Sequence, residues 1–131
     1  MELKLEKPFR LHLDVYEVDE RVPSMRMRVV AEVQRLGNRF DYKGNLWFDC
    51  AIWEAFVSGL TNIEEKATEL IDMDDRFVLR LCVESGTPMI SWRFKDVGLP
   101  GPVCTLTYQS PIDLDDLAYV RNRFTELNRW W

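Results

Sequence analysis

Residues 77–84 read Phe-Val-Leu-Arg-Leu-Cys-Val-Glu, and this stretch carries the main signal for the type of fold. Its apolar side chains, Phe77, Leu79, Leu81 and Val83, alternate with other residues and fall on one side of an extended chain. Residues 89–96 and 103–108 repeat the alternation. Strict alternation of this kind predicts strands that have one buried face and one solvated face.

The N-terminal half carries the same pattern. We expect further strands over residues 8–17, 25–34 and 39–48 and a short one over 68–73. Gly37-Asn38 is typical of a hairpin turn, because both residues tolerate positive φ. Gly44-Asn45 predicts a bulge or a second turn within 39–48.

Two amphipathic segments interrupt the strands. The first follows Asp49, a good N-cap, and we expect it to end near Gly59 to Asn62. The second follows Asp113, with acidic residues in its first turn, where the helix dipole favours negative charge. Its apolar stripe consists of Leu117, Val120, Phe124 and Leu127.

The expected order of elements is therefore βββαββββα. Short turns between strands imply antiparallel pairing. We expect a single α+β domain over residues 1–131, an antiparallel sheet of about six to seven strands with two helices packed on one face. A chain of 131 residues is long enough for a hydrophobic core of its own.

The composition narrows the classes of partner. The formal net charge is −5 and the pI about 4.9, which argues against binding to nucleic acid or to anionic lipid. A negative surface favours a basic protein partner, although solubility alone explains it equally well. Without a signal peptide or an apolar run of about 20 residues, we expect a cytoplasmic protein.

Catalytic and metal-binding motifs are missing from the sequence. His12 is the single histidine, and we expect it opposite the apolar face of its strand. The cysteines Cys50, Cys82 and Cys104 are far apart and stand among apolar neighbours, so we expect buried free thiols. We therefore expect no enzyme activity, no metal and no cofactor.

Acidic and aromatic residues are the candidates for protein binding. The densest acidic region includes Glu64, Glu65, Asp72, Asp74 and Asp75. A solvated turn is the alternative interpretation. Among the five tryptophans, Trp47 and Trp53 lie out of phase with neighbouring apolar residues, so either can serve as an exposed anchor, although packing against the sheet is favoured for each.

Arginines also gather in the N-terminal half, at Arg26, Arg28, Arg35 and Arg39. Such a group can bind an anion. Glu32 and Asp41 are interspersed among them, however, and this favours charge pairs across the strands.

Residues 46–127 resemble the WapI-type immunity proteins of polymorphic or contact-dependent toxin systems. The similarity includes the helix over 50–60, with Glu54, Phe56 and Leu60 in the order of a family pattern, and the break over 108–114 before the last helix. The resemblance implies a non-enzymatic protein that neutralises a toxin. It transfers no binding residue by itself.

The leading hypothesis is an immunity or antitoxin-like protein whose acidic surface binds a basic toxin domain. The alternative is a structural or adaptor domain that self-associates, for example as a homodimer, through a sheet edge or through Trp130 and Trp131. A third hypothesis is an enzyme or a small-ligand module.

Overall fold

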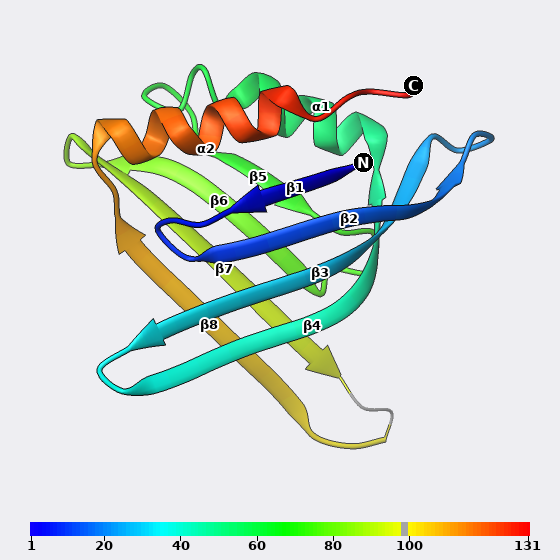
Figure 1. The fold of residues 1–131 in the computed structure, drawn as a ribbon, viewed down its shortest axis with the longest axis horizontal. Coiled ribbons are helices and arrows are strands. Elements are labelled where there is room, and N and C mark those ends of the chain that lie inside the picture. The colour runs from blue at the N-terminus through cyan, green and yellow to red at the C-terminus, as the bar shows by residue number, and fades with distance from the viewer. Residues whose placement is uncertain (98–99) are drawn as a thin grey trace.

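The computed structural model describes residues 1–97 and 100–131 and shows two four-stranded antiparallel sheets (Figure 1). The first sheet contains β1 (Glu2–Leu5), β2 (Arg10–Asp19), β3 (Ser24–Arg35) and β4 (Asn38–Asp49). The second contains β5 (Thr68–Ile71), β6 (Phe77–Glu84), β7 (Thr87–Val97) and β8 (Val103–Pro111). In both sheets the strands follow one another in chain order. The helices are α1 (Cys50–Gly59), between the sheets, and α2 (Leu114–Glu126), after β8.

The expectation of an α+β chain with two helices is confirmed, but that of one sheet with both helices on one face is wrong. The first sheet lies across the second in Figure 1, and the helices lie together along one end. Helices of 10 and 13 residues are about 15 and 20 Å long, whereas a seven-stranded sheet is about 34 Å wide. Two short helices cannot cover such a face, and the sheets instead bury their apolar faces against each other.

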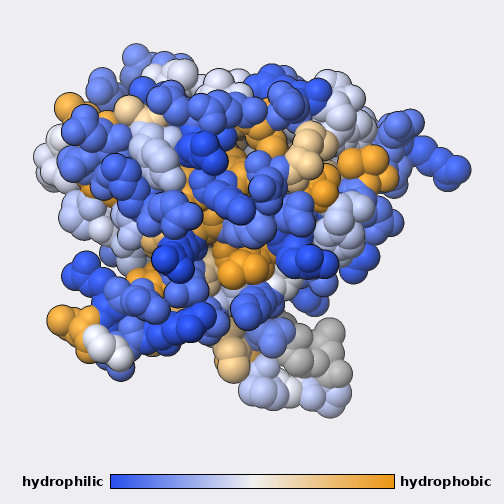
Figure 2. Space-filling model, viewed as in Figure 1, coloured by the Kyte–Doolittle hydropathy of each residue, from blue (hydrophilic) through white to orange (hydrophobic). Residues whose placement is uncertain are grey.

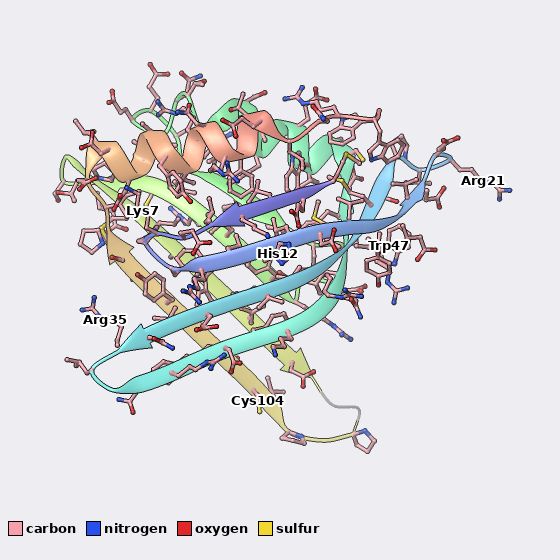
Figure 3. The ribbon with its side chains drawn as sticks, viewed as in Figure 1. Lys7, His12, Arg21, Arg35, Trp47 and Cys104 are labelled. Carbon is pink, nitrogen blue, oxygen red and sulfur yellow. The ribbon has the colours of Figure 1, made fainter. Side chains whose placement is uncertain are left out.

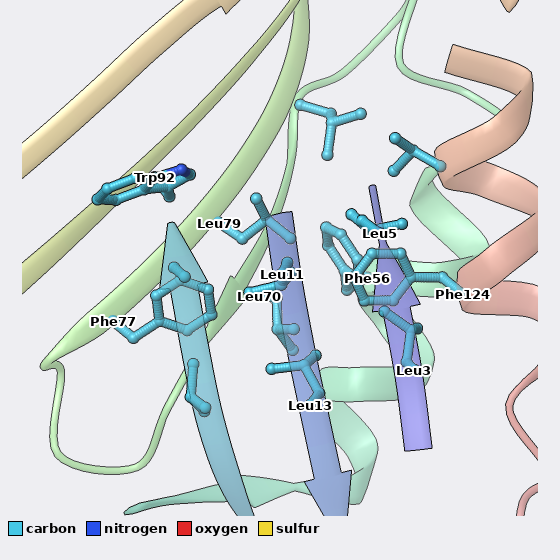
Figure 4. Close-up of a cluster of buried hydrophobic side chains, with 14 of the residues drawn as sticks. Leu3, Leu5, Leu11, Leu13, Phe56, Leu70, Phe77, Leu79, Trp92 and Phe124 are labelled. Atoms are coloured by element: carbon cyan, nitrogen blue, oxygen red, sulfur yellow. The ribbon is translucent and has the colours of Figure 1, made fainter. Parts of the chain in front are cut away.

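Aromatic side chains join the two sheets. Tyr42 of β4 stacks on Phe94 of β7, with 3.7 Å between ring centroids and 19° between planes. Phe48 of β4 meets Phe77 of β6 edge to face at 6.1 Å. Figure 4 shows leucines of β1 and β2 meeting side chains of β6, β7 and both helices. The core is therefore one continuous layer between the sheets and beneath the helices.

Both helices begin at the residues that the sequence predicts. The Asp49 carboxylate accepts a hydrogen bond of 2.7 Å from the Ala51 N–H, and that of Asp113 accepts one of 2.7 Å from the Asp116 N–H. The helices contact each other through Phe56 of α1 and Phe124 of α2, whose rings lie 5.0 Å apart. The expected apolar stripe of α2 is buried throughout.

Three local features differ from the sequence-based expectations. β1 was not expected, although Leu3 and Leu5 alternate with polar residues and are buried. The β3–β4 turn consists of Leu36 and Gly37, both at positive φ, one residue earlier than expected. Gly44 marks no turn, because β4 pairs with β3 without a break. A Cβ atom there would collide with the phenol oxygen of Tyr42.

Candidate functional site

Trp47 is held beside the turn between β5 and β6. The backbone C=O of Trp47, near the end of β4, accepts a hydrogen bond of 2.8 Å from the backbone N–H of Met73. The first and second sheets therefore meet at this corner. Trp47 is half-buried, and Met73 is exposed over 54% of its surface.

Asp72 determines the shape of the acidic turn, residues 72–75. Its Oδ1 atom accepts hydrogen bonds from the backbone N–H groups of Arg76 and Phe77, at 2.7 and 2.8 Å. Its Oδ2 atom accepts one from the N–H of Asp74 at 3.2 Å. The turn is thereby preorganised, since one buried carboxylate satisfies three backbone donors.

The other two carboxylates of the acidic turn are exposed. Asp75 lies at a positive φ of 54° and forms an ion pair of 3.1 Å with Arg93 of β7. Asp74 forms no ion pair with any residue that the structure describes. Asp74 is therefore the acidic group of this turn that is available to a partner.

An aromatic and cationic neighbour extends this corner along the first sheet. Arg26 is the cross-strand partner of Trp47, so the two side chains share the outer face. The Arg26 guanidinium lies 5.4 Å from the centre of the Tyr16 ring and 3.3 Å from Glu17. We call the residues at this corner the Trp47 surface: Tyr16, Met73, Asp74 and Asp75, which are exposed, and Arg26 and Trp47, which are half-buried.

The figures place this surface at one end of the first sheet. Figure 3 shows Trp47 at the end where β4 leads into α1, away from Lys7 and Arg35 at the other end. Figure 2 shows hydrophilic side chains over most of the same view. The Trp47 surface therefore combines two aromatic side chains and a methionine with the charged side chains of Arg26, Asp74 and Asp75.

Glu64 and Glu65 lie apart from the Trp47 surface, in the connection between α1 and β5. Both are exposed. Glu65 lines a groove of about 510 Å3 between α1 and the beginning of β5. The two acidic segments predicted from the sequence thus stand at opposite ends of β5, before Thr68 and after Ile71.

Two of the predicted binding residues are not on the surface. Trp53 is only 1% exposed and packs between Phe48 and Phe124. Asp72 is 3% exposed and bonds only to the backbone of its own turn. The expectation that these two side chains face a partner is therefore wrong. The burial of Trp53 could not be predicted from its neighbours in the sequence, because α2, which covers it, lies far away along the chain.

Glu2, Tyr42 and Cys50, three groups with a shifted pKa, lie on separate elements, β1, β4 and α1. His12 Nε2 lies 2.9 Å from Oε2 of Glu2 on the outer face of the first sheet, and this bond, helped by Lys4, lowers the pKa of Glu2. Burial, with smaller contributions from nearby carboxylates, raises the pKa of the Cys50 thiol from 9.0 to about 11. Burial also raises the pKa of Tyr42, and the charge of Asp72 adds to the effect.

The three cysteines differ in burial, and Arg39 forms ion pairs. Cys50 and Cys82 are buried free thiols, as expected. The expectation for Cys104 is wrong: it is exposed at the beginning of β8, on the part of the β7–β8 hairpin that extends beyond the first sheet (Figure 3). Arg39 pairs with Glu32 at 3.2 Å and with Asp41 at 3.7 Å, which confirms the expected pairing across strands for this arginine.

Within residues 1–97 and 100–131, no three His, Cys, Asp or Glu side chains lie close enough to hold a metal ion. In the same part of the chain, no helix is both long and apolar enough to cross a bilayer.

Three members of the Trp47 surface, Tyr16, Arg26 and Met73, were not among the protein-binding residues predicted from sequence. Tyr16 is the unpaired residue at a register shift between Val15 and Glu17, and its ring lies beside Arg26. An interrupted alternation at Val15-Tyr16-Glu17 was the available signal.

Compared with models of protein families, with curated proteins and with solved structures, the chain matches none.

Proposed function

We propose that this protein is a non-enzymatic, cytoplasmic immunity or antitoxin-like protein that binds and neutralises a cognate toxin domain. The Trp47 surface is the proposed contact. Its acidic groups would steer association with a basic toxin, and its aromatic side chains would supply contact area.

One observation carries this proposal: the hydrogen bond between Met73 and Trp47, which fixes a half-exposed tryptophan beside the acidic turn. A preorganised surface loses little conformational entropy when it binds. Asp72 supplies that preorganisation through its three backbone hydrogen bonds. The resemblance of residues 46–127 to WapI-type immunity proteins supports the same class of partner.

The ion pairs around the surface leave one of its acidic groups free for a basic partner. Arg26 pairs with Glu17 and Arg93 with Asp75, whereas Arg28, beside Tyr16, and Arg76 form no ion pair with a residue that the structure describes. Among the members of the Trp47 surface, the unpaired charge is that of Asp74. Charge reversal at Asp74 is therefore the sharpest change, since it alters the free charge and leaves the ion pairs intact.

The test uses the product of the neighbouring gene as the candidate toxin, with cell survival and equilibrium binding as readouts. We expect Trp47→Ala to weaken binding about 30-fold, as for an interface hot spot, and Asp74→Lys to weaken it about tenfold or more. Glu6→Lys is the matched control, because Glu6 is exposed at the far end of the first sheet. Normal survival with both surface variants, or no complex with the native protein, would refute the proposal.

Self-association is a second candidate, and one observation favours it. β8 is an edge strand of nine residues, Val103–Pro111, with no charged side chain. Charged residues usually protect long edge strands from pairing with another chain. Sedimentation equilibrium of the native protein and of Thr107→Lys tests this candidate: a dimer that the lysine abolishes supports it, and a monomer at every concentration removes it.

A further inference from the structure

β5 presents an open backbone edge. In the antiparallel pairing of β5 with β6, alternate residues direct their backbone groups toward β6. The Asp72 N–H donates to the Phe77 C=O at 3.3 Å, so Leu70 and Thr68, in the same phase, also face β6. The N–H and C=O groups of Glu69 and Ile71 therefore point away from the sheet, toward the side where β5 has no neighbouring strand.

A groove runs along this open edge. It has a volume of about 510 Å3 and lies between α1 and residues 65–69. Its α1 wall includes Ile52, which is 43% exposed, and the small residues Ala55, Ser58 and Gly59. Small side chains keep the helix from filling the space beside the strand.

Gly59 brings the end of α1 close to the strand. A Cβ atom at Gly59 would collide with the side chain of Thr68, whose Oγ1 donates a hydrogen bond of 3.1 Å to the Phe56 C=O. The helix and the strand thus form a fixed channel with an apolar wall on one side and backbone donors and acceptors on the other. This is the arrangement in which an extended peptide can add to a sheet.

The charges around the channel indicate the sign of the occupant. Glu65 and Glu69 line it together with Lys66, and Glu69 also pairs with Arg80 at 3.4 Å. The exposed carboxylates of Glu64 and Asp74 lie before and after β5. A positively charged segment is therefore favoured over a negative one.

We propose that β5 is an acceptor strand, and that an extended basic segment of a protein partner pairs with its open edge and lies against α1. The five residues 67–71 span about 16 Å of extended chain, enough to pair with a segment of four or five residues. The identification of this partner as the toxin rests on the proposed function. The segment would run toward the Trp47 surface, since Met73 lies two residues beyond the end of β5.

The first experiment needs no toxin. A peptide of alternating lysine and valine is titrated at millimolar concentration into the native protein, and amide shifts are followed by NMR. We expect shifts at Ala67, Glu69 and Ile71 and slower hydrogen exchange at the amides of Glu69 and Ile71. A peptide of alternating glutamate and valine is the charge control. No shift at β5, or equal shifts with the two peptides, would overturn the proposal.

The second experiment separates the backbone from the side chain at Glu69. Glu69→Pro removes the outward N–H but no hydrogen bond to β6, since a proline is tolerated at such an edge position. Glu69→Gln removes the charge alone. We expect Glu69→Pro to weaken peptide binding about tenfold relative to Glu69→Gln, the effect of losing one hydrogen bond.

A third variant covers the case in which Glu69→Pro fails to fold. Ala55→Trp fills the channel from α1, whereas Ala51→Trp adds the same side chain at an exposed position of α1 outside the channel. We expect only the former to abolish binding. Equal binding by the two tryptophan variants contradicts the proposal.

With the toxin domain, the same variants distinguish the two proposals. A complex that forms equally well with Glu69→Pro and Glu69→Gln, and with both tryptophan variants, refutes strand addition and leaves the proposed function standing. Binding of the lysine peptide without any toxin complex supports the acceptor strand and refutes the proposed function.

Discussion

Asp72 accepts a hydrogen bond of 2.8 Å from the backbone N–H of Phe77, the first residue of β6. The carboxylate therefore acts inside the molecule, although its sequence neighbours Asp74 and Asp75 are exposed. One acidic cluster in the sequence thus serves two purposes: a buried member shapes the turn, and exposed members face the solvent.

Replacing Asp72 is expected to destabilise the protein. Asp72→Ala leaves the buried N–H of Phe77 without its acceptor, and we expect a loss of about 3 kcal/mol in the free energy of unfolding, measured with urea. Asp74→Ala is the control, because its exposed carboxylate accepts no hydrogen bond within the described part of the chain, and its effect should stay below about 0.5 kcal/mol. Equal losses in the two variants would contradict this role for Asp72.

Leu36 offers a stabilising substitution. It is 95% exposed and has a φ of 52° in the β3–β4 turn, a conformation that suits asparagine better than leucine. We expect Leu36→Asn to raise the free energy of unfolding by about 1 kcal/mol. Leu114→Asn is the matched control, since Leu114 is 73% exposed but begins α2 without a positive φ. A gain in the control of the same size would show that exposure, not φ, is responsible.

The thiols should differ in reactivity. At pH 8 we expect a thiol reagent to modify Cys104 rapidly and Cys50 only on unfolding, because Cys50 is 1% exposed and its pKa is raised to about 11. Mass spectrometry after timed quenching measures the two rates. Rapid modification of Cys50 in the folded protein would contradict the burial of its thiol.

The same thiol makes stability depend on alkaline pH. The folded state holds the Cys50 proton more tightly than the unfolded state, in which the pKa is near 9.0. Its contribution is therefore complete below pH 9 and is lost as the pH rises toward 11. We expect the native protein to lose stability over this range more steeply than Cys50→Ala, as measured by urea unfolding at each pH. Parallel pH profiles of stability for the native protein and Cys50→Ala would argue against a raised pKa of Cys50.

The C-terminal tail should contribute to stability and not to assembly. Trp130 and Trp131 pack against the core, and the preceding Arg129 forms an ion pair of 2.6 Å with Glu54 of α1. We expect removal of the two tryptophans to lower Tm by about 4 °C or more with no change in oligomeric state. Glu54→Ala should have a small effect, because the ion pair is exposed. A dimer of the native protein that dissociates on truncation would restore the tail as an association site.

Most elements could be predicted from sequence because their signals are local. Alternation over residues 77–84 places Phe77, Leu79 and Leu81 in the core, and the caps Asp49 and Asp113 mark the helix starts. The number of sheets could not be predicted this way. An alternating strand records that one face is buried but not whether a helix or a second sheet buries it.

The candidate site was only partly predictable for a similar reason. Trp47 and Asp74 were proposed from their residue types, but the hydrogen bond that brings Met73 to Trp47 joins residues 26 positions apart. The same patterns placed Trp53 and Asp72 on the surface, where the structure buries them. Exposure of a tryptophan depends on what packs over it, and its neighbours in the chain do not reveal this.

Local chemistry in the sequence specified the strands other than β1, the helix boundaries, the acidic charge and the residue types that a partner would meet. Contacts between distant segments set the packing of the two apolar sheet faces against each other and left one edge of the strand between the two acidic segments open. The difference lies in the range of the interactions. Alternation, capping and turn formation act between residues a few positions apart, whereas sheet packing and surface formation depend on contacts between distant segments that short patterns do not encode.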